Sequence, residues 1–418
     1  MASPVYMRIR YYAVHIYTSQ DTCYENHKLD RGLVMSLRAK GAVTGIGETD
    51  YTRNSSKSAF ELQIQASLLA IRDAGLDPKD IDGVIPIGLT GAPAEQFVTN
   101  FGIPDLRFSA VTPMGGASGI AAIQTAIAVI EAGICNHVLI PSGRNVSSGA
   151  RAGVRIHQMP QFHLITEYEY PLGAISPAQL YAPMARRHME LFGTTSEQLA
   201  EIAVTIRGHA NLNDNAIMRD KPMSVDDHQA SRMITDPFRL FDCSLESDGG
   251  AAVVISASRA ARDMPQHPVD VLGIAEGHPD SPSAITPRGD MTTLGLAKAA
   301  PVAFEMAGVR HADIDVAEIY DCFTWVVLCQ LEDMGFCQKG EGGAFVEGGR
   351  LRLGGELPTT THGGLLSQAH MLGMNHIVEL VRQLRHEAGR AQVLGAEIGL
   401  CTGYGDMGDG AIAIMQRG

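Results

Sequence analysis

The sequence lacks two features that would tie the protein to a membrane or to nucleic acid. No run of about 18 apolar residues, the length that a membrane-spanning helix needs, occurs in the chain of 418 residues. A surplus of positive charge is also missing, because 33 Lys and Arg residues stand against 46 Asp and Glu residues, for a net charge of −13. We therefore expect neither a membrane span nor nonspecific binding to nucleic acid. A local basic patch for an anionic ligand is compatible with this balance.

Cysteine is scarce and follows no known spacing pattern. The chain has seven cysteines, an odd number without the CxxC pairs of a zinc site or a disulfide framework. Cys322, Cys329 and Cys337 lie near one another in the sequence, but they are expected to be small buried apolar residues. The pattern predicts a reduced, cytoplasmic protein that holds no metal.

The N-terminal residues also lack the continuous apolar segment and the small-residue cleavage site of a signal peptide. Regular hydrophobic periodicity begins only after Met35, which is a candidate for the true start of the protein. We therefore expect residues 1–38 to be an appendage.

The segment "TPMGGASGIAA", residues 112–122, combines glycines and small residues with the start of an apolar helix. Backbone N–H groups at such a helix start are free to bind a ligand. An acyl-transfer enzyme would place a cysteine or serine nucleophile there, but the expected position holds Gly116. Ser118, two residues later, is expected to cap or pack the helix rather than to react.

The chain contains an internal repeat. "AGLDPKDID" at 74–82 and "AGVRHADID" at 307–315 share Ala, Gly, Asp, Ile and Asp at one offset, 307 − 74 = 233. Each copy reads as a helix, a glycine C-cap, a short loop and a buried strand. Further on, "GGASGIAAIQTAIAVIEAG" before "HVLIPSG" corresponds to "GGLLSQAHMLGMNHIVELVRQLR" before "AEIGLCTGYG". We therefore predict a duplicated α/β unit.

The alternation of strands and helices predicts parallel sheets covered on both faces, stacked as α-β-α-β-α layers. The predicted halves span residues 39–265 and 266–418. An insertion at about 150–240 interrupts the first half, and we expect it to form a loop domain or lid over the substrate. Inside it, Thr194 and Glu197 have the spacing of a capping box.

Several segments together carry a resemblance to a known family. They are, in chain order, "GGASGIAA", "DPFRLFDCSLESDGGAAVV", "YDCFT", "GFCQKGEGG", "THGGLLSQAHMLGMNH", "VRQLR" and "CTGYG". The chain resembles the thiolase superfamily, and most of all its sterol carrier protein X-type thiolases and bacterial lipid-transfer protein thiolase-like enzymes. This resemblance covers residues from about 38 to 418 and implies a duplicated, five-layered thiolase fold with an inserted loop domain.

The resemblance also implies which residues form the site. Thiolases carry a nucleophilic cysteine at the position of Gly116, and a histidine or asparagine where this chain has Tyr320 in "YDCF". Their activating histidine corresponds to His370, and their proton-transferring cysteine corresponds to Cys401 of the "CTGYG" loop. We expect Tyr320, His370 and Cys401 to be catalytic.

A second set of residues is expected to bind the substrate or its oxyanion. It comprises Gly116 and Ser118 at the helix start, Gly403 of the "CTGYG" loop and, with less support, His362 before the paired glycines. For Cys401, a buried free thiol without a chemical role is an equally good interpretation.

Thiolysis through an acyl-enzyme requires a thiolate, which the chain does not offer at the expected place. Retro-aldol cleavage of a β-hydroxyacyl-CoA needs none: a base takes the hydroxyl proton, a carbonyl compound leaves, and an acyl-CoA enolate is stabilised and reprotonated. We expect N–H groups at residues 116–118, together with His370, to hold the enolate oxygen. Tyr320 would move the proton with the help of a nearby cation or donor, since a free phenol has a pKa of about 10. Gly116 would leave room for a branched β-carbon.

Two other functions stay open: an acyltransferase that uses Cys401 or a partner's residue as nucleophile, and a noncatalytic acyl-CoA- or lipid-binding subunit. Family members that lack the cysteine look like aldolases of steroid side-chain degradation, and they carry a second tyrosine where this chain has His370. The resemblance implies coenzyme A, as acyl-CoA substrate, and no metal. It also implies a homodimer, or a heterotetramer with an acyl-CoA-binding protein of OB-fold and zinc-ribbon type.

Overall fold

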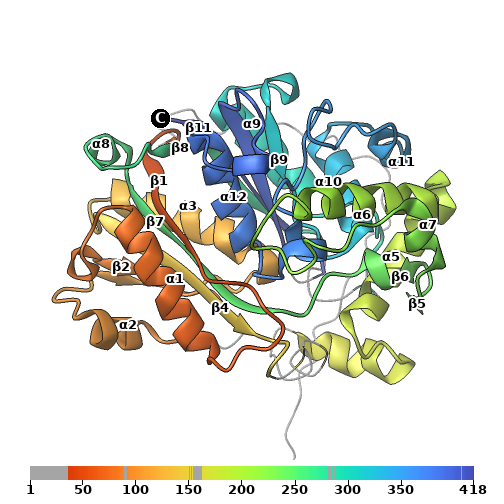
Figure 1. The fold of residues 1–418 in the computed structure, drawn as a ribbon, viewed down its shortest axis with the longest axis horizontal. Helices are drawn as coiled ribbons and strands as arrows, with labels where there is room; N and C mark the ends of the chain where they lie inside the picture. Colours follow the sequence, from red (N-terminus) through yellow and green to blue (C-terminus); the bar gives the residue numbers. More distant parts are fainter. Residues whose placement is uncertain are drawn as a thin grey trace, which may run out of the picture. The chain divides into compact units, whose positions relative to one another are not determined.

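A mixed sheet is the centre of the fold. The computed structural model describes residues 36–88, 92–149, 151, 153, 162–280, 285, 288–405 and 407–418. Within this part, nine strands form one sheet in the order β3-β2-β4-β7-β1-β8-β11-β10-β9 (Figure 1). In chain order they are β1 (Gly41–Glu48), β2 (Gly83–Val84), β3 (Phe108–Ser109), β4 (His137–Asn145), β7 (Asp248–Ala257), β8 (Val269–Gly277), β9 (Val316–Glu318), β10 (Ile398–Gly405) and β11 (Asp409–Arg417).

The sheet repeats one arrangement twice, which confirms the predicted duplication. The first half runs β2-β4-β7-β1 and the second runs β9-β10-β11-β8, so that the two halves meet where β1 pairs with β8. In each half the first pair is parallel, and the next two pairs are antiparallel. The halves therefore match in strand order and in strand direction.

The expectation of parallel sheets is wrong for most strand pairs. β10 and β11 are joined by a short connection at residues 406–408, and such a connection forces the two strands to run antiparallel. A parallel pair needs a long crossover, which is what the helical segments before β4 and β10 provide. The hydrophobic pattern that the sequence shows is common to both kinds of buried strand.

Helices cover the sheet in layers, as the five-layered prediction requires. The helices are α1 (Ala59–Asp73), α2 (Ala94–Phe101), α3 (Ser118–Glu131), α8 (Ser258–Ala261), α9 (Leu296–Ala307), α10 (Thr324–Met334), α11 (Gly342–Val346) and α12 (Met374–Arg385). Figure 1 shows α3 and α12 in the middle, α1 and α2 toward one side, and α9 and α10 toward the other. The apolar core between α3, α12 and strands of both halves is one continuous cluster.

The two central helices differ in how they begin. α3 starts from a 3₁₀ turn at Gly115–Ala117, and α12 starts after Gly373, whose φ of 81° lies in the left-handed region. Almost every residue of α12 is buried, including the polar His376 and Glu379. Gly116 lies in the turn before α3, and His370 lies shortly before the start of α12. The segments before the two helices, rather than the helix bodies, therefore carry these two residues of the predicted site.

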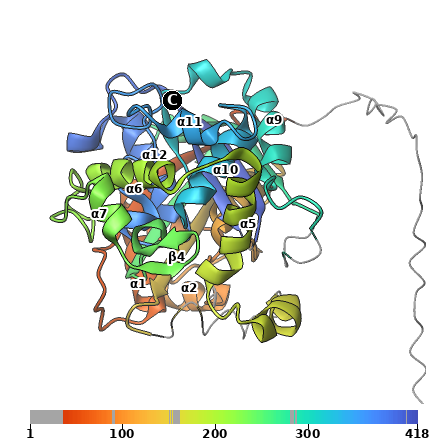
Figure 2. The ribbon, with the colours of Figure 1, turned by 90° about the vertical axis from the view of Figure 1, so that its right-hand side faces the viewer.

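The inserted region between β4 and β7 is mainly helical where the structure describes it. It contains α5 (Pro177–Phe192), α6 (Ser196–Ala210), α7 (Val225–Ala230) and a two-stranded sheet of β5 (Met233–Thr235) and β6 (Phe238–Arg239). Figure 2 shows α5, α6 and α7 on the same face as α10. The interior of this region is continuous with the core around α9 and α10.

The capping box of α6 is displaced by one residue from the predicted pair. Thr195 caps the helix, accepting the N–H of Gln198, whose side chain in turn accepts the N–H of Thr195. The hydroxyl of Thr194 is instead bonded to Nδ1 of the buried His188 at 3.0 Å. Two adjacent threonines offered the same local signal, and a tertiary contact decides between them.

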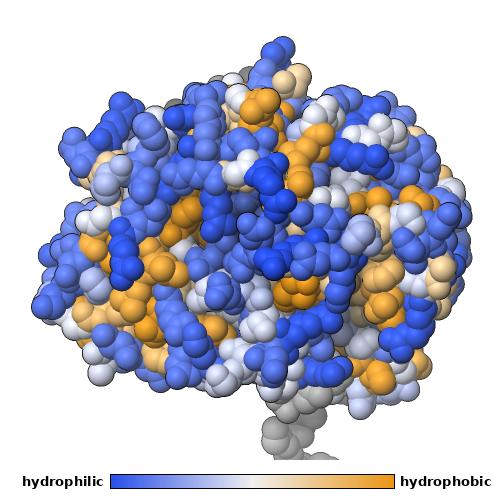
Figure 3. Space-filling view, viewed as in Figure 1, coloured by the Kyte–Doolittle hydropathy of each residue, from blue (hydrophilic) through white to orange (hydrophobic). Residues whose placement is uncertain are grey.

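Leu37–Gly418 forms one compact unit. Of the expected appendage at residues 1–38, residues 1–35 lie outside the described part of the chain. Figure 3 shows a face that is mainly hydrophilic, with apolar patches between the charged side chains. Among the described residues, no helix combines the length and the apolar character that crossing a bilayer would require.

Candidate active site

A cavity of about 1200 Å³ lies between the start of α3, the segment after β9 and the inserted region. Gly116, Tyr320 and His370 all line it, so the structure brings together three of the residues that the sequence singled out. Ser118, His362, Cys401 and Gly403 do not line it. The remaining wall is mostly apolar, with residues from α5 and from the segments on either side of β6.

Tyr320 occupies the space that a side chain at residue 116 would need. A Cβ atom added to Gly116 would overlap with Cζ, Cε2 and the hydroxyl oxygen of the Tyr320 ring. Tyr320 is buried, with 3% of the residue exposed. The expectation that Gly116 leaves room for the substrate's β-carbon is therefore wrong, because the phenol fills that room.

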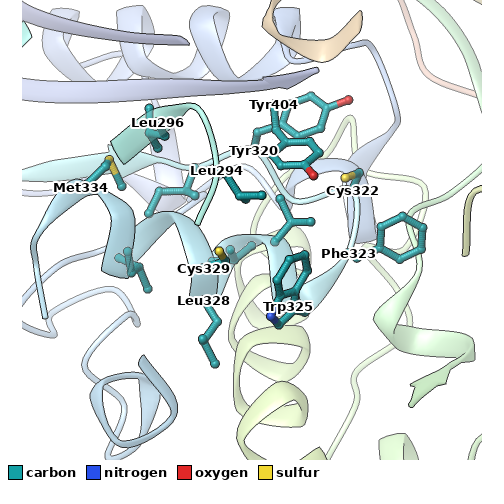
Figure 4. Close-up of a cluster of buried hydrophobic side chains, with 14 of the residues drawn as sticks. Leu294, Leu296, Tyr320, Cys322, Phe323, Trp325, Leu328, Cys329, Met334 and Tyr404 are labelled. Carbon is teal, nitrogen blue, oxygen red and sulfur yellow. The ribbon is translucent and has the colours of Figure 1, made fainter. Parts of the chain in front are cut away.

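The backbone of Tyr320 is held by two buried side chains. Its N–H donates to Oγ1 of Thr402 at 3.0 Å, and its carbonyl accepts from Nε2 of Gln330 at 2.7 Å. The Thr402 hydroxyl in turn donates to Oε1 of Gln330 at 2.7 Å, which closes the clamp. The Tyr320 ring stacks on those of His376 and Tyr404, at centroid distances of 5.9 and 6.4 Å. Figure 4 shows Tyr320 and Tyr404 side by side.

The turn before α3 is closed by its own hydrogen bonds. The N–H of Ala117 donates to the Met114 carbonyl at 2.9 Å, and the N–H of Ser118 donates to the Gly115 carbonyl. The Ser118 hydroxyl accepts the N–H of Met114 at 3.0 Å. The N–H groups of Ala117 and Ser118 are therefore not available to an oxyanion, contrary to expectation, and Ser118 stabilises the turn.

β10 packs directly on this turn. A Cβ atom at Gly403 would lie 2.6 Å from the Ala117 Cα and 2.8 Å from the Gly116 carbonyl oxygen. One at Gly405 would overlap with the Met114 carbonyl. Both glycines of the "CTGYG" segment thus permit close approach of two backbones. Gly403 supports the site from behind instead of lining the cavity.

Cys401 lies in the sheet and not in the cavity. Its side chain is 0% exposed and belongs to the central apolar core. Burial, with the neighbouring Glu318 carboxylate, raises the pKa of the Cys401 thiol far above its ordinary value. The thiol therefore stays protonated, which favours the interpretation as a buried apolar residue. Its catalytic role stays a prediction.

His370 is held from two sides. Its backbone N–H donates to the Ser247 hydroxyl at 2.7 Å, and its Nδ1 lies 2.5 Å from Nη1 of Arg144 at the end of β4. Burial first, and then the charge of Arg144, lowers the pKa of His370 well below its ordinary value. The imidazole is therefore neutral at physiological pH.

His362 lies in a buried polar network beneath Tyr320. Its Nδ1 contacts the Glu318 carboxylate at 2.9 Å, and burial lowers the pKa of His362 to about 3. Next to it, Nε2 of His376 donates to Asp321, which also accepts the N–H groups of Leu365 and Leu366. No group of three or more His, Cys, Asp or Glu residues in the described part of the chain is placed to hold a metal ion.

Two thiols do line the cavity, Cys243 and Cys322. Burial raises the pKa of Cys243 to about 12, and burial together with Asp321 raises that of Cys322 well above its ordinary value. Neither thiol is a thiolate near pH 7, so neither is an activated nucleophile.

The cavity also has a basic component that the sequence reasoning missed. Four arginines line it: Arg53, Arg144, Arg151 and Arg207. Arg144 is 6% exposed and Arg207 is 4% exposed, while Arg53 and Arg151 are exposed. The signal for Arg144 was a charged residue directly after the buried strand "HVLIPSG". The net charge of the chain concealed this local concentration of positive charge.

Comparison with known proteins identifies the family of the chain. A family profile described as "Thiolase C-terminal domain-like" matches residues 277–417. A "Steroid side-chain-cleaving aldolase" of Thermomonospora curvata is 37% identical over 356 residues, which cover 84% of this chain and 91% of that protein. A "17-hydroxy-3-oxo-4-pregnene-20-carboxyl-CoA lyase" of Mycobacterium tuberculosis is 37% identical over 358 residues, covering 84% and 92%.

A solved structure of an aldolase is also similar to this chain in fold and sequence. The "Ltp2-ChsH2(DUF35) aldolase" aligns with a TM-score of 0.86 and 34% sequence identity, covering 91% of this chain and 99% of that chain. The similarity thus extends over both halves of the sheet and over the inserted region.

Proposed function

This chain belongs to the thiolase superfamily, within the group of sterol carrier protein X-type thiolases and lipid-transfer-type aldolases, and we propose that it cleaves a carbon–carbon bond of a β-hydroxyacyl-CoA by a retro-aldol reaction. The observation that carries this proposal is the overlap between a side chain at residue 116 and the Tyr320 ring. A phenol stands where a thiolase would hold its nucleophile. Two relatives with similar sequences are described as an aldolase and a lyase.

Among the described residues, neither thiol of the cavity, nor Ser118 or Cys401, is an activated nucleophile. Cys243 and Cys322 line the cavity as protonated thiols, Cys401 lies outside it, and Ser118 uses its hydroxyl in the turn. An acyltransferase mechanism would need one of these groups to become a strong nucleophile. The retro-aldol route needs none.

In the proposed reaction the phenolate form of Tyr320 accepts the proton of the β-hydroxyl group and becomes the neutral phenol. The electrons of that O–H bond form the carbonyl of the leaving ketone or aldehyde, and the bond between Cα and Cβ breaks. The electron pair of the broken Cα–Cβ bond moves into the thioester group, which becomes an enolate. Cα then takes a proton, either the one held by Tyr320 or one from water, and acyl-CoA is released. No atom of the substrate becomes bonded to the protein.

The enolate oxygen requires a hydrogen-bond donor, and His370 is the residue that we assign to this role. The neutral ring accepts on Nδ1 from Arg144 and therefore carries its proton on Nε2. A donor of this kind is typically worth about 3–4 kcal/mol of transition-state stabilisation. The His370 ring meets the Tyr320 ring edge to face at a centroid distance of 6.2 Å, so both groups can act on one substrate.

The cavity supports a large acyl-CoA as substrate. Its volume of about 1200 Å³ exceeds the roughly 300–1,000 Å³ typical of pockets for drug-sized ligands. The exposed Arg53 and Arg151 at its wall suit the phosphates of coenzyme A, and the apolar residues suit a polycyclic or branched acyl group. We propose a sterol-like side chain because two relatives are described as a steroid side-chain-cleaving aldolase and a pregnene-carboxyl-CoA lyase.

We further propose a homodimer that binds a partner subunit of OB-fold and zinc-ribbon type. The support for this proposal is the solved structure with a similar fold, whose name, "Ltp2-ChsH2(DUF35) aldolase", joins the aldolase to ChsH2. In such an assembly the partner would share the binding of the acyl-CoA.

The test is to incubate the purified protein, alone and with its partner, with a β-hydroxyacyl-CoA and with the matching β-ketoacyl-CoA. We expect a ketone or aldehyde and a shortened acyl-CoA from the hydroxy substrate, without added CoA. Chain shortening of the keto substrate that depends on CoA would instead support a thiolase. Tight binding without turnover, in the presence of the partner, would support a noncatalytic subunit.

A further inference from the structure

Arg144 and His370 form a contact whose polarity is fixed by chemistry. Arg144 ends β4 and is 6% exposed, and its Nη1 lies 2.5 Å from Nδ1 of His370. A guanidinium has donors but no acceptor, and it does not lose its proton in proteins. Nδ1 must therefore be the acceptor, and the single proton of the neutral ring must be on Nε2.

We propose that Arg144 is a positioning residue for the reaction, which fixes His370 in the tautomer with its proton on Nε2 and so makes it a hydrogen-bond donor to the substrate. This inference rests on the proposed function, since it explains how His370 serves the enolate. Both residues line the cavity. The Nδ1 side of the ring is occupied by Arg144, which leaves the Nε2 proton for the ligand.

Of the other groups around His370, one opposes Arg144: a hydrogen bond with the backbone of His370 itself raises the pKa of the ring, whereas burial and the charge of Arg144 lower it. Ser247 bonds the backbone N–H of His370 and not its ring. Tyr320 meets the ring edge to face at 6.2 Å, and His376 adds only a weaker influence in the same direction as Arg144. The other charged residues that line the same cavity are Arg53, Arg151, Arg207 and Glu246. Arg144 is the one with a hydrogen bond to the imidazole among the described residues.

Removing Arg144 would leave Nδ1 free to bind a proton. The pKa of the ring would then rise, although burial, the larger cause of its lowering, would remain, or the neutral ring would shift its single proton to Nδ1. In the second case the lone pair of Nε2 would face the enolate oxygen and repel it. Arg144→Lys keeps a cationic donor on a shorter reach, and Arg144→Met keeps much of the length without charge.

The experiment is nitrogen NMR on protein with ¹⁵N-labelled histidine, in which His370 is assigned from the signal that disappears in His370→Gln. We expect wild-type His370 to show a protonated Nε2 and an unprotonated Nδ1 from pH 6 to 8. In Arg144→Met we expect the tautomers to mix, so that Nδ1 becomes partly protonated, and we expect the pKa of the ring to rise from its wild-type value while burial still lowers it. Arg53→Met, which removes another cavity arginine that does not contact His370, should leave the His370 signals unchanged.

A wild-type His370 that carries its proton on Nδ1, or that titrates near its ordinary pKa, would overturn the inference even if every variant failed to fold. Unchanged His370 signals in a folded Arg144→Met would overturn it as well. Kinetics add a second readout: kcat of Arg144→Met should be lower than that of the wild type from pH 6 to 8, while Arg144→Lys restores part of it. Because NMR needs no turnover, the inference and the proposed function can fail separately.

Discussion

At the scale of single residues, Gly116 and Tyr320 act as one unit. The ring occupies the volume of any side chain at residue 116, so the loss of a nucleophile and the presence of the phenol are linked by sterics. Gly373 completes the enclosure, because a Cβ there would lie 3.1 Å from Cδ2 of Tyr320. The chemistry that we assign to the site follows from the presence of a phenol in place of a nucleophilic side chain.

Tyr320→Phe tests the proton transfer directly. The phenyl ring should keep the packing around Gly116 while removing the hydroxyl, so acyl-CoA binding should persist. We expect kcat for carbonyl release to fall by about 10²-fold or more, the usual contribution of a general acid–base group. Stopped assays of product and calorimetric binding measure the two effects, and an unchanged kcat would remove Tyr320 from the mechanism.

Gly116→Cys tests the steric link. The added thiol has no space, so we expect no acylation by acyl-CoA and a loss of about 1–3 kcal/mol of stability from overpacking. The double variant Gly116→Cys with Tyr320→Ala makes room for the thiol and should become acylated.

The matched control is Gly208→Ala in α6, where an added Cβ meets no atom within 4 Å. It should not destabilise the protein, since alanine exceeds glycine in helix propensity by about 1 kcal/mol. If mass spectrometry showed acylation of Gly116→Cys alone, the Tyr320 ring must move aside, and the phenol would not exclude a side chain at residue 116.

Sequence patterns identified Gly116, Tyr320 and His370, which line the same cavity, because each lies in a short segment that resembles a thiolase motif. Their roles remain proposals. Arg144 and the overlap of Tyr320 with residue 116 could not be read from the sequence, since both depend on contacts between segments far apart in the chain.

At the scale of secondary-structure elements, the site depends on how β10 meets the start of α3. Gly403 and Gly405 let the two backbones approach, and Thr402 between them reaches the Tyr320 backbone. The motif "CTGYG" therefore matters here for its glycines and its threonine. The sequence predicted the duplicated order of elements correctly, whereas strand direction depended on connection lengths that hydrophobic patterns do not encode.

Cys401→Ala on β10 separates the two interpretations of this thiol. We expect retro-aldol turnover to be retained and stability to fall by about 1 kcal/mol, as for a small cavity in a core. Cys135→Ala, another buried thiol, which contacts the Asp82 carbonyl in the first half of the fold, is the matched control. If Cys401→Ala stayed folded but lost turnover while Cys135→Ala did not, Cys401 would belong in the mechanism.

At the scale of the whole molecule, buried titratable groups couple stability to pH. The pKa of His362 is lowered from 6.5 to about 3, so the unfolded chain binds a proton before the folded one does. Stability should therefore fall as the pH drops below 6.5. Glu318 and Asp333 act in the opposite sense, since burial raises the pKa of each to about 6. The lowered pKa values of His137, His209 and His370 act in the same sense as that of His362, so we expect the decline toward acid to prevail.

We predict that the free energy of unfolding, measured with urea from pH 7.5 to 5, declines toward acid. His362→Gln should lower stability at pH 7.5 and flatten this decline, because glutamine does not titrate. A decline in His362→Gln as steep as in the wild type would assign the effect to other groups, such as His209, whose pKa is also lowered by burial.

The central claim is that the protein breaks a carbon–carbon bond without bonding to its substrate. Intact-protein mass spectrometry during steady turnover of a β-hydroxyacyl-CoA tests it most directly, with the complex sampled while the carbonyl product accumulates. We predict that the chain keeps its unmodified mass throughout. An acyl adduct on any side chain, formed and consumed at the rate of turnover, would contradict the account.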